Sequence, residues 1–300
     1  MKGNEFAGLG LEEIAEKIES MEIRGAAKIA RAAAHALKEE AVKDEGELDE
    51  RINEAVERLK RTRPTAVSLH NAIRFVTMNK NSDFTADMIK ERVDTFIKKS
   101  HSAGEKIAEY GGKRISSGNT ILTHCNSSMA LKAIKYAWDE GKEIDVIATE
   151  SRPKKQGYIT VREMAEYGIP VTLIVDSAVR YKMTDVDHVY VGADTIASNG
   201  AVINKIGTSQ VALCAHEARV PVTVCAETYK FSRETAFGNL VDIEERDPEE
   251  IVDPDEFPGV KINNPVFDAT PADYVDCVVT EEGVISPSES YRVIKEMMKG

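Results

Sequence analysis

The sequence predicts an α/β protein in which an N-terminal helical domain, residues 1–114, precedes a Rossmann-like domain, residues 115–300, with a mainly parallel sheet. The first part of the chain repeats apolar residues at helical spacing and contains no convincing strand. After Gly118, short apolar runs rich in Val and Ile alternate with helical segments, as in a parallel sheet with crossover helices. The chain has 300 residues, 42% of them hydrophobic and 30% charged, which is typical of a globular protein with a sizeable core.

Four or five helices are expected in the first domain. The segment LEEIAEKIESM places Leu11, Ile14 and Ile18 on one helical face. A third helix is expected to end where Pro64 interrupts the pattern. Helical periodicity is found, in chain order, in LEEIAEKIESM, AAKIARAAAHALKEEA, ELDERINEAVERLKRT, AVSLHNAIRFVTM and ADMIKERVDTFIKKSHSAGEKIAEYG.

The second domain is expected to contain five parallel strands and a final strand followed by a turn. The strands are predicted in NTILTHC, KEIDVIATE, PVTLIVD, DHVYVGAD, PVTVCAE and VDCVVTEEGVISP, and the helices in SMALKAIKYAWDEG, VREMAEYG, SAVRYKM, TSQVALCAHEAR and SESYRVIKEMMKG. The Ser-Asn-Gly turn of ASNGAVIN predicts a small hairpin after the fourth strand. The acidic, proline-containing stretch from Asp242 to Glu256 is expected to be a solvated excursion at the surface.

Charge and cysteine content exclude several classes of function. A net charge of −12 argues against non-specific nucleic-acid or membrane binding. Because the start of the chain lacks the apolar core of a secretory signal, we expect a cytoplasmic protein. The four cysteines are widely spaced without a CxxC pair, so neither a zinc site nor a disulfide framework is expected. Cys214 and Cys225 lie in apolar elements and are expected to be small core residues.

Polar residues follow each of the five predicted parallel strands. In an open parallel sheet, ligands bind beyond the carboxyl ends of the strands, so these residues are expected to converge on one edge. They are His124-Cys125-Asn126, Glu150-Ser151-Arg152, Asp176-Ser177, Asp194, and Glu227 to Lys230. The dinucleotide and P-loop fingerprints are both missing from the sequence, which argues against those two ligand classes.

Cys125 is the candidate nucleophile or base. Asn126, Ser127 and Ser128 can cap a helix that begins near Met129, and a thiol beside a helix start can have a lowered pKa. The alternative is a packed, inert cysteine at the end of a strand. Its position on the predicted ligand edge favours the reactive role.

Asp194 and the segment after it are the second candidate. An aspartate after VYVGA could simply cap the next turn. However, Asn204 and Lys205 lie just before a Gly-Thr helix start, and amides, a lysine and a helix N-terminus together suit a phosphate. Four histidines, His70, His101, His188 and His216, are instead expected to be surface or core residues.

Several short segments carry a resemblance to a known family. They are Arg24-Gly-Ala-Ala27, Arg63-Pro-Thr-Ala66, Thr123-His-Cys-Asn126, Glu150-Ser-Arg-Pro153, Gly192-Ala-Asp194, Asn204-Lys-Ile-Gly-Thr208 and Ala226-Glu-Thr-Tyr-Lys230. In this order, over essentially the whole chain, they resemble the initiation-factor-2B alpha/beta/delta-like family. That family includes sugar-phosphate isomerases as well as subunits of a translation factor.

The resemblance implies an enzyme, because isomerases of the family carry a catalytic Cys and Asp, here Cys125 and Asp194, which the regulatory subunits lack. It is greatest for archaeal enzymes that convert ribose 1,5-bisphosphate to ribulose 1,5-bisphosphate. The basic RGAAKIA segment and Lys230 favour that substrate over methylthioribose 1-phosphate, whose isomerases usually have a GAPAIG-like stretch. Ser151 replaces the commoner threonine and keeps the hydroxyl. The alternatives are a methylthioribose-1-phosphate isomerase and a translation-factor-like regulatory subunit.

The implied mechanism needs no metal or redox cofactor. Asp194 would protonate the ring oxygen, and Cys125, as thiolate, would remove the C2 proton to give a cis-phosphoenolate. The predicted substrate-binding residues are Arg24, Gly25, Ala26, Ala27, Arg63, Asn204, Lys205 and Lys230, with Arg152, Asn126 and Ser127 as further candidates, in a cleft between the domains. The product would connect AMP and nucleoside breakdown to the carboxylating enzyme RuBisCO. The resemblance also implies a homo-oligomer, either a dimer or a trimer of dimers.

Overall fold

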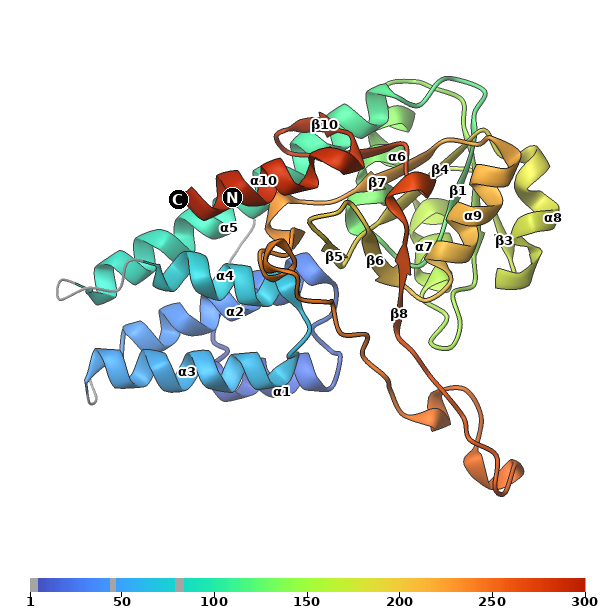
Figure 1. Cartoon of the computed structure of the whole chain (residues 1–300). Helices are drawn as coiled ribbons and strands as arrows, with labels where there is room; N and C mark the ends of the chain where they lie inside the picture. Colours follow the sequence, from blue (N-terminus) through green and yellow to red (C-terminus); the bar gives the residue numbers. More distant parts are fainter. Residues whose placement is uncertain (1–4, 44–46, 79–83, 300) are drawn as a thin grey trace. The chain divides into compact units, whose positions relative to one another are not determined.

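The structure of the protein is a computed structural model that describes residues 5–43, 47–78 and 84–299 (Figure 1). The chain divides into two compact units, Met1–Ser102 and Ala103–Gly300. The division falls inside the long helix α5 (Ala86–Lys113), whereas the sequence places the domain boundary after residue 114, at the end of that helix. None of the helices in the described ranges is long and apolar enough to cross a membrane.

The first unit is helical, as predicted. It contains α1 (Leu11–Glu19), α2 (Ala26–Ala41), α3 (Leu48–Thr62), α4 (Val67–Thr77) and the first part of α5. Helix α2 packs against α1, α3 and α4, and alanines on almost every face of the helix are buried. Small side chains let neighbouring helices approach closely, which explains why this Ala-rich segment becomes the centre of the unit.

The second unit contains a seven-stranded sheet in the order β10-β9-β7-β4-β1-β2-β3. The five predicted parallel strands are all present and parallel to their neighbours. The final apolar run forms two strands that pair antiparallel, so the turn predicted there leads into an edge strand. The strands of this sheet are β1 (Thr120–Thr123), β2 (Asp145–Thr149), β3 (Val171–Ile174), β4 (His188–Gly192), β7 (Val222–Cys225), β9 (Cys277–Thr280) and β10 (Gly283–Ile285).

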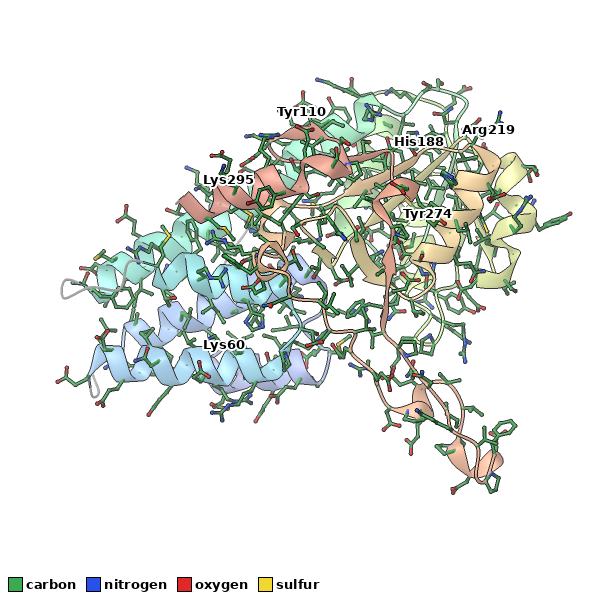
Figure 2. All side chains as sticks on the ribbon, viewed as in Figure 1. Lys60, Tyr110, His188, Arg219, Tyr274 and Lys295 are labelled. Carbon is green, nitrogen blue, oxygen red and sulfur yellow. The ribbon has the colours of Figure 1, made fainter. Side chains whose placement is uncertain are left out.

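Helices cover both faces of this sheet and bury its central strands. One core cluster joins the end of α5, α6 (Ser128–Asp139) and α7 (Gly157–Glu166) to the sheet. The other joins α8 (Val179–Lys182), α9 (Thr208–Ala218) and α10 (Ser290–Lys299) to the opposite face. Cys214 and Cys225 are both buried, which confirms their prediction as core residues. His188 is also buried, against Tyr190, whereas Arg219 is exposed just after α9 (Figure 2).

A smaller antiparallel sheet of β5 (Thr195–Ile196), β6 (Val202–Lys205) and β8 (Phe267–Thr270) follows β4. The predicted hairpin is therefore confirmed as β5 and β6. The third strand, β8, was not predicted, because its short sequence FDAT has no alternating pattern and its partner strand lies far upstream. The register pairs Asn204 with Asp268, which brings a carboxylate to the start of α9.

The acidic segment is an exposed excursion, as predicted. It forms two short 3-10 turns, η5 (Pro248–Glu250) and η6 (Pro254–Glu256), outside both sheets of the second unit (Figure 1). It is attached to the loop after β2, because Arg152 Nη2 donates to the Ile251 carbonyl at 3.1 Å and Lys154 pairs with Glu250 at 3.2 Å.

Candidate active site

The carboxyl edge of the large sheet brings together the predicted reactive residues of the second unit. Cys125 follows β1, Asp176 follows β3 and Asp194 follows β4. Asp194 and Asp176 both act electrostatically on the Cys125 thiol, and so does Lys205 at the end of β6. Two carboxylates and an ammonium group therefore lie within electrostatic range of the thiol.

Cys125 has an unusual backbone conformation. Its φ of 67° lies in the left-handed region, which residues with a Cβ adopt only at a cost of about 1–2 kcal/mol. Its N–H donates to Ser151 Oγ at 2.7 Å, and its carbonyl oxygen accepts from Thr160 Oγ1 at 2.8 Å. Two hydroxyl groups from separate parts of the chain thus satisfy both polar groups of the Cys125 backbone.

A buried chain of hydrogen bonds extends from Ser151 through Thr149 to His124, and the donor and acceptor of each bond can be assigned. His124 Nε2 lies 2.8 Å from the Ile206 carbonyl, which can only accept, so Nε2 carries the proton. Burial lowers the pKa of His124, which keeps the ring neutral and leaves Nδ1 as an acceptor. Thr149 Oγ1, 2.6 Å from Nδ1, must therefore donate to it, and Ser151 Oγ, 3.2 Å from Thr149 Oγ1, in turn donates to Thr149.

The backbone of Ser151 is also held in place. Its φ is 60°, and its N–H donates to Asp176 Oδ1 at 2.8 Å, while the N–H of Arg152 donates to Asp176 Oδ2 at 2.7 Å. Asp176 was noted in the sequence only as a residue after a strand. Its role as an anchor of the neighbouring turn depends on the pairing of β2 with β3, which the sequence pattern does not specify.

The expectation of a lowered thiol pKa at Cys125 is wrong for the free protein. Burial raises the pKa of Cys125 to about 11. Lys205 and the backbone N–H of Asn126 act to lower it, but Asp194 and Asp176 add to the rise. The Ser127 side chain caps α6 by accepting from the N–H of Ala130 at 3.3 Å.

Two of the amides at the start of α9 already have a carboxylate partner. Asp268 accepts from the N–H of Gly207 at 2.7 Å and from the N–H of Ser209 at 3.1 Å. Burial raises the pKa of Asp268 to about 6, although these amides and Lys205 act in the opposite direction. The sequence shows no sign of this role for Asp268, because the residue reaches the helix only through the pairing of β6 with β8.

The neighbouring polar side chains of β6 differ in accessibility. Asn204 is buried and donates from Nδ2 to Thr208 Oγ1 at 2.9 Å, which stabilises the turn before α9. Lys205 is half-buried, and its Nζ lies 5.0 Å from the centre of the Phe267 ring. Of the two predicted phosphate ligands on this strand, Asn204 is therefore buried and only Lys205 is partly accessible.

Lys230 is held by a carboxylate. Its Nζ lies 2.9 Å from Oε2 of Glu227, and both side chains are almost completely buried. Burial acts to raise the pKa of Glu227, but attraction to Lys230 and hydrogen bonds from Lys230 and Tyr229 outweigh it and lower that pKa. A phosphate at Lys230 would have to share the ammonium group with Glu227.

Other predicted site residues have structural contacts of their own. Asn126 Nδ2 donates to Thr160 Oγ1 at 3.1 Å, and Arg152 reaches the acidic segment. In the first unit, Arg24 is exposed before α2, whose N-cap residue Gly25 has a φ of 85° and leaves the helix start without a side-chain cap. Ala26 and Ala27 begin that helix, and Arg63 Nη1 lies 3.3 Å from Met21 Sδ. In the described part of the chain, no group of three or more His, Cys, Asp or Glu side chains could hold a metal ion.

Known proteins match the chain over almost its whole length. The model of the Initiation factor 2 subunit family matches residues 22–287. The ribose 1,5-bisphosphate isomerase of Archaeoglobus fulgidus is 55% identical, with 95% of this chain and 93% of that protein covered. The enzyme of the same name from Methanocaldococcus jannaschii is 51% identical, with 95% and 94% covered.

More distant matches include a methylthioribose-1-phosphate isomerase and a translation initiation factor, the two alternatives considered from the sequence. The methylthioribose-1-phosphate isomerase of Desulfitobacterium hafniense is 35% identical, with 96% of this chain and 91% of that protein covered. The crystal structure of the translation initiation factor eIF-2B of Pyrococcus horikoshii superposes with a TM-score of 0.84 at 33% identity, with 94% of this chain and 98% of that chain covered. The superposition shows that this chain shares the fold of that structure.

We expect Asp268 to make the stability of the protein depend on pH. Because the folded-state pKa is raised from 3.8 to about 6, the contribution of Asp268 is largest below pH 3.8 and is lost as the pH rises through 6. Relative to Asp268→Asn, the wild type should lose about 2 kcal/mol of unfolding free energy between pH 4.5 and pH 7, measured by urea denaturation.

The Asn variant is its own control for the pH effect, since it keeps every other titratable group of the protein. Parallel stability curves for the two proteins over this range would show that the carboxyl group titrates as an ordinary exposed aspartate.

Proposed function

Because the chain belongs to the Initiation factor 2 subunit family, we propose that it is one of the isomerases of that family and converts ribose 1,5-bisphosphate to ribulose 1,5-bisphosphate. The observation that carries the proposal is the placement of Cys125 and Asp194 at one edge of the sheet, within electrostatic range of each other and of Lys205. Identity of 51% and 55% to two ribose 1,5-bisphosphate isomerases supports the choice of substrate.

The proposed reaction moves protons between the sugar and two protein groups. The carboxylic acid form of Asp194 protonates the ring oxygen, and the bond from that oxygen to C1 breaks. The thiolate of Cys125 removes the proton from C2, which gives the cis-phosphoenolate. Cys125 then returns its proton to C1 while the C2 hydroxyl returns one to Asp194, so the ketone forms and both groups regain their starting states. Each positioned acid or base step contributes about 10²- to 10⁴-fold in rate.

In the free protein the shared proton is on Cys125, whereas the proposed reaction needs it on Asp194. With a pKa near 11, Cys125 is a thiol at neutral pH, and Asp194 acts on it as an anion. The reactive form, a thiolate beside a carboxylic acid, contains the same number of protons. We propose that one proton moves from Cys125 to Asp194 before the chemical step, so that the pair titrates as a unit.

The phosphate groups are proposed to bind to basic side chains rather than to the start of α9. Lys205 is half-buried beside Cys125, while Lys230 is already paired with Glu227. Arg24 and Arg63 of the first unit remain proposed ligands on the basis of the family resemblance. Replacing Lys205 by alanine should raise KM, because a phosphate contact is lost, and should also lower kcat, because Lys205 acts to lower the pKa of the Cys125 thiol.

Two alternatives are less well supported. A methylthioribose-1-phosphate isomerase needs only one phosphate site, and the relative of that name is 35% identical. A purely regulatory subunit would have no use for Cys125 and Asp194 at one edge.

We also propose a cytoplasmic homo-oligomer, either a dimer or a trimer of dimers, since a related tetrameric eIF2B complex shares the fold. Light scattering on the purified protein would measure its mass.

We expect the purified protein to isomerise ribose 1,5-bisphosphate, and Cys125→Ser and Asp194→Asn each to lower kcat by about 10²- to 10⁴-fold. The loss follows from removing the C2 base or the ring-oxygen acid. Turnover should be assayed with ribose 1,5-bisphosphate and, in parallel, with methylthioribose 1-phosphate.

The matched controls are Cys214→Ser, at a buried cysteine outside the site, and Asp185→Asn, at an exposed aspartate paired with Lys182. Both should keep near wild-type turnover. Faster turnover of methylthioribose 1-phosphate would favour the other isomerase, and an active, folded Cys125→Ser or Asp194→Asn variant would refute the assigned roles.

We further expect kcat/KM to change little between about pH 7 and pH 9, and to fall only as the pH approaches 11. A lone thiolate with this pKa would instead give a tenfold rise for every pH unit in that range. The one-proton pair predicts a plateau, because the reactive form and the resting form bind the same number of protons. A pH profile with a slope of one on the logarithmic scale would rule out the shared proton.

A further inference from the structure

Two buried hydroxyl groups hold the backbone of Cys125 on both sides. Ser151 and Thr160 are both completely buried. Ser151 Oγ accepts from the N–H of Cys125 at 2.7 Å, and Thr160 Oγ1 donates to its carbonyl oxygen at 2.8 Å. The first residue follows β2 and the second lies on α7, so two separate elements fix one residue.

The neighbours of Ser151 leave its oxygen atom as an acceptor for this bond. The neutral His124 ring, with its proton on Nε2, requires the Thr149 hydroxyl as donor to Nδ1. Thr149 Oγ1 can then only accept from Ser151, which leaves the lone pairs of Ser151 Oγ free to accept the N–H of Cys125. The proton on one histidine nitrogen therefore sets the orientation of the hydroxyl beside Cys125.

Thr160 is brought to Cys125 by a close approach of two elements. Helix α7 starts at Gly157 against the end of β2, where an added Cβ would lie only 1.7 Å from the Thr149 carbonyl oxygen. This contact brings the first turn of α7, and with it Thr160, beside the loop after β1. Asn126 Nδ2 donates to Thr160 Oγ1 at 3.1 Å, which orients the threonine hydroxyl toward the Cys125 carbonyl.

We propose that Ser151 and Thr160 are positioning residues that hold Cys125 in its left-handed conformation and so aim its thiol at C2 of the substrate. The inference rests on the proposed function, because it assigns these two hydroxyls to the base of that reaction. Without both hydrogen bonds, a non-glycine residue at a φ of 67° would relax toward an ordinary conformation and carry the sulfur atom away from its position. Neither hydroxyl touches the substrate in this proposal.

The experiment compares Ser151→Ala and Thr160→Val with the wild type in two measurements. The first is steady-state turnover of ribose 1,5-bisphosphate. A displaced base should lower kcat by about 10- to 100-fold and leave KM within about twofold, because binding of the phosphates does not involve these groups.

The second measurement is the rate at which iodoacetamide alkylates Cys125 at pH 8, followed by peptide mass spectrometry. Burial raises the thiol pKa, so a released Cys125 should react about tenfold faster while it becomes a poorer catalyst. Cys214, Cys225 and Cys277 are buried and serve as internal controls, because their alkylation reports general unfolding.

The chain offers a matched control and two rescue variants. Thr123 on β1 is completely buried, and its hydroxyl has no hydrogen-bond partner among the described residues. Thr123→Val therefore removes a hydroxyl two residues before Cys125 without removing a bond, and should keep wild-type values of kcat and alkylation rate. Ser151→Thr and Thr160→Ser retain the hydroxyls and should restore kcat to within a few-fold of the wild type.

The outcomes separate this proposal from the proposed function. If Ser151→Ala and Thr160→Val match Thr123→Val in both measurements, the positioning role is refuted. Equal loss of kcat in all three variants would refute it as well, since it would report packing alone. If Thr160→Val does not fold, Ser151→Ala decides the question. If the wild type does not turn over ribose 1,5-bisphosphate, the proposed function fails, and the alkylation rates still decide whether the two hydroxyls position Cys125.

Discussion

The turn from β1 into α6 is the constraint on which the site depends. At this turn the chain must leave a largely buried strand, pass through Cys125 and start a helix after only four intervening residues, 124–127. Buried N–H and C=O groups need partners, and a residue between two elements cannot obtain them from either element. Ser151 and Thr160 provide them from neighbouring elements. The conformation of Cys125 is therefore a property of β1, β2 and α7 together.

The same edge concentrates negative charge around the thiol. Asp194 and Asp176 act on Cys125, and Asp268 accepts hydrogen bonds from the N–H groups of Gly207 and Ser209 at the start of α9. Lys205 is the cation that acts on both Cys125 and Asp268. In a protein with a net charge of −12, an anionic substrate must be attracted by such local cations. Burial and these carboxylates also explain why the free thiol keeps its proton.

Neutral hydrogen-bonded groups, rather than ion pairs, connect the strand ends beneath Cys125. His124, Thr149 and Ser151 are all buried, and a neutral histidine avoids the desolvation cost of a charged one. His124 Nε2 donates to the Ile206 carbonyl and Thr149 Oγ1 donates to His124 Nδ1, and the shortest contact of Ser151 Oγ within this group is to Thr149 Oγ1. By contrast, Lys230 and Glu227 form an almost completely buried ion pair, which binds Lys230 to its own loop and reduces its availability to a ligand.

Periodicity and residue order in the sequence were sufficient to identify the helical first part, the five parallel strands, the β5–β6 hairpin, and Cys125 and Asp194 as residues after strands. These features are local, because apolar spacing reports which elements form and parallel strands place their ends at a common edge. Tertiary contacts alone decided the raised pKa of Cys125, the pairing that brings Asp268 to α9, and the hydroxyls of Ser151 and Thr160 around Cys125. Burial and hydrogen bonding between distant segments control these properties, and no local pattern encodes them.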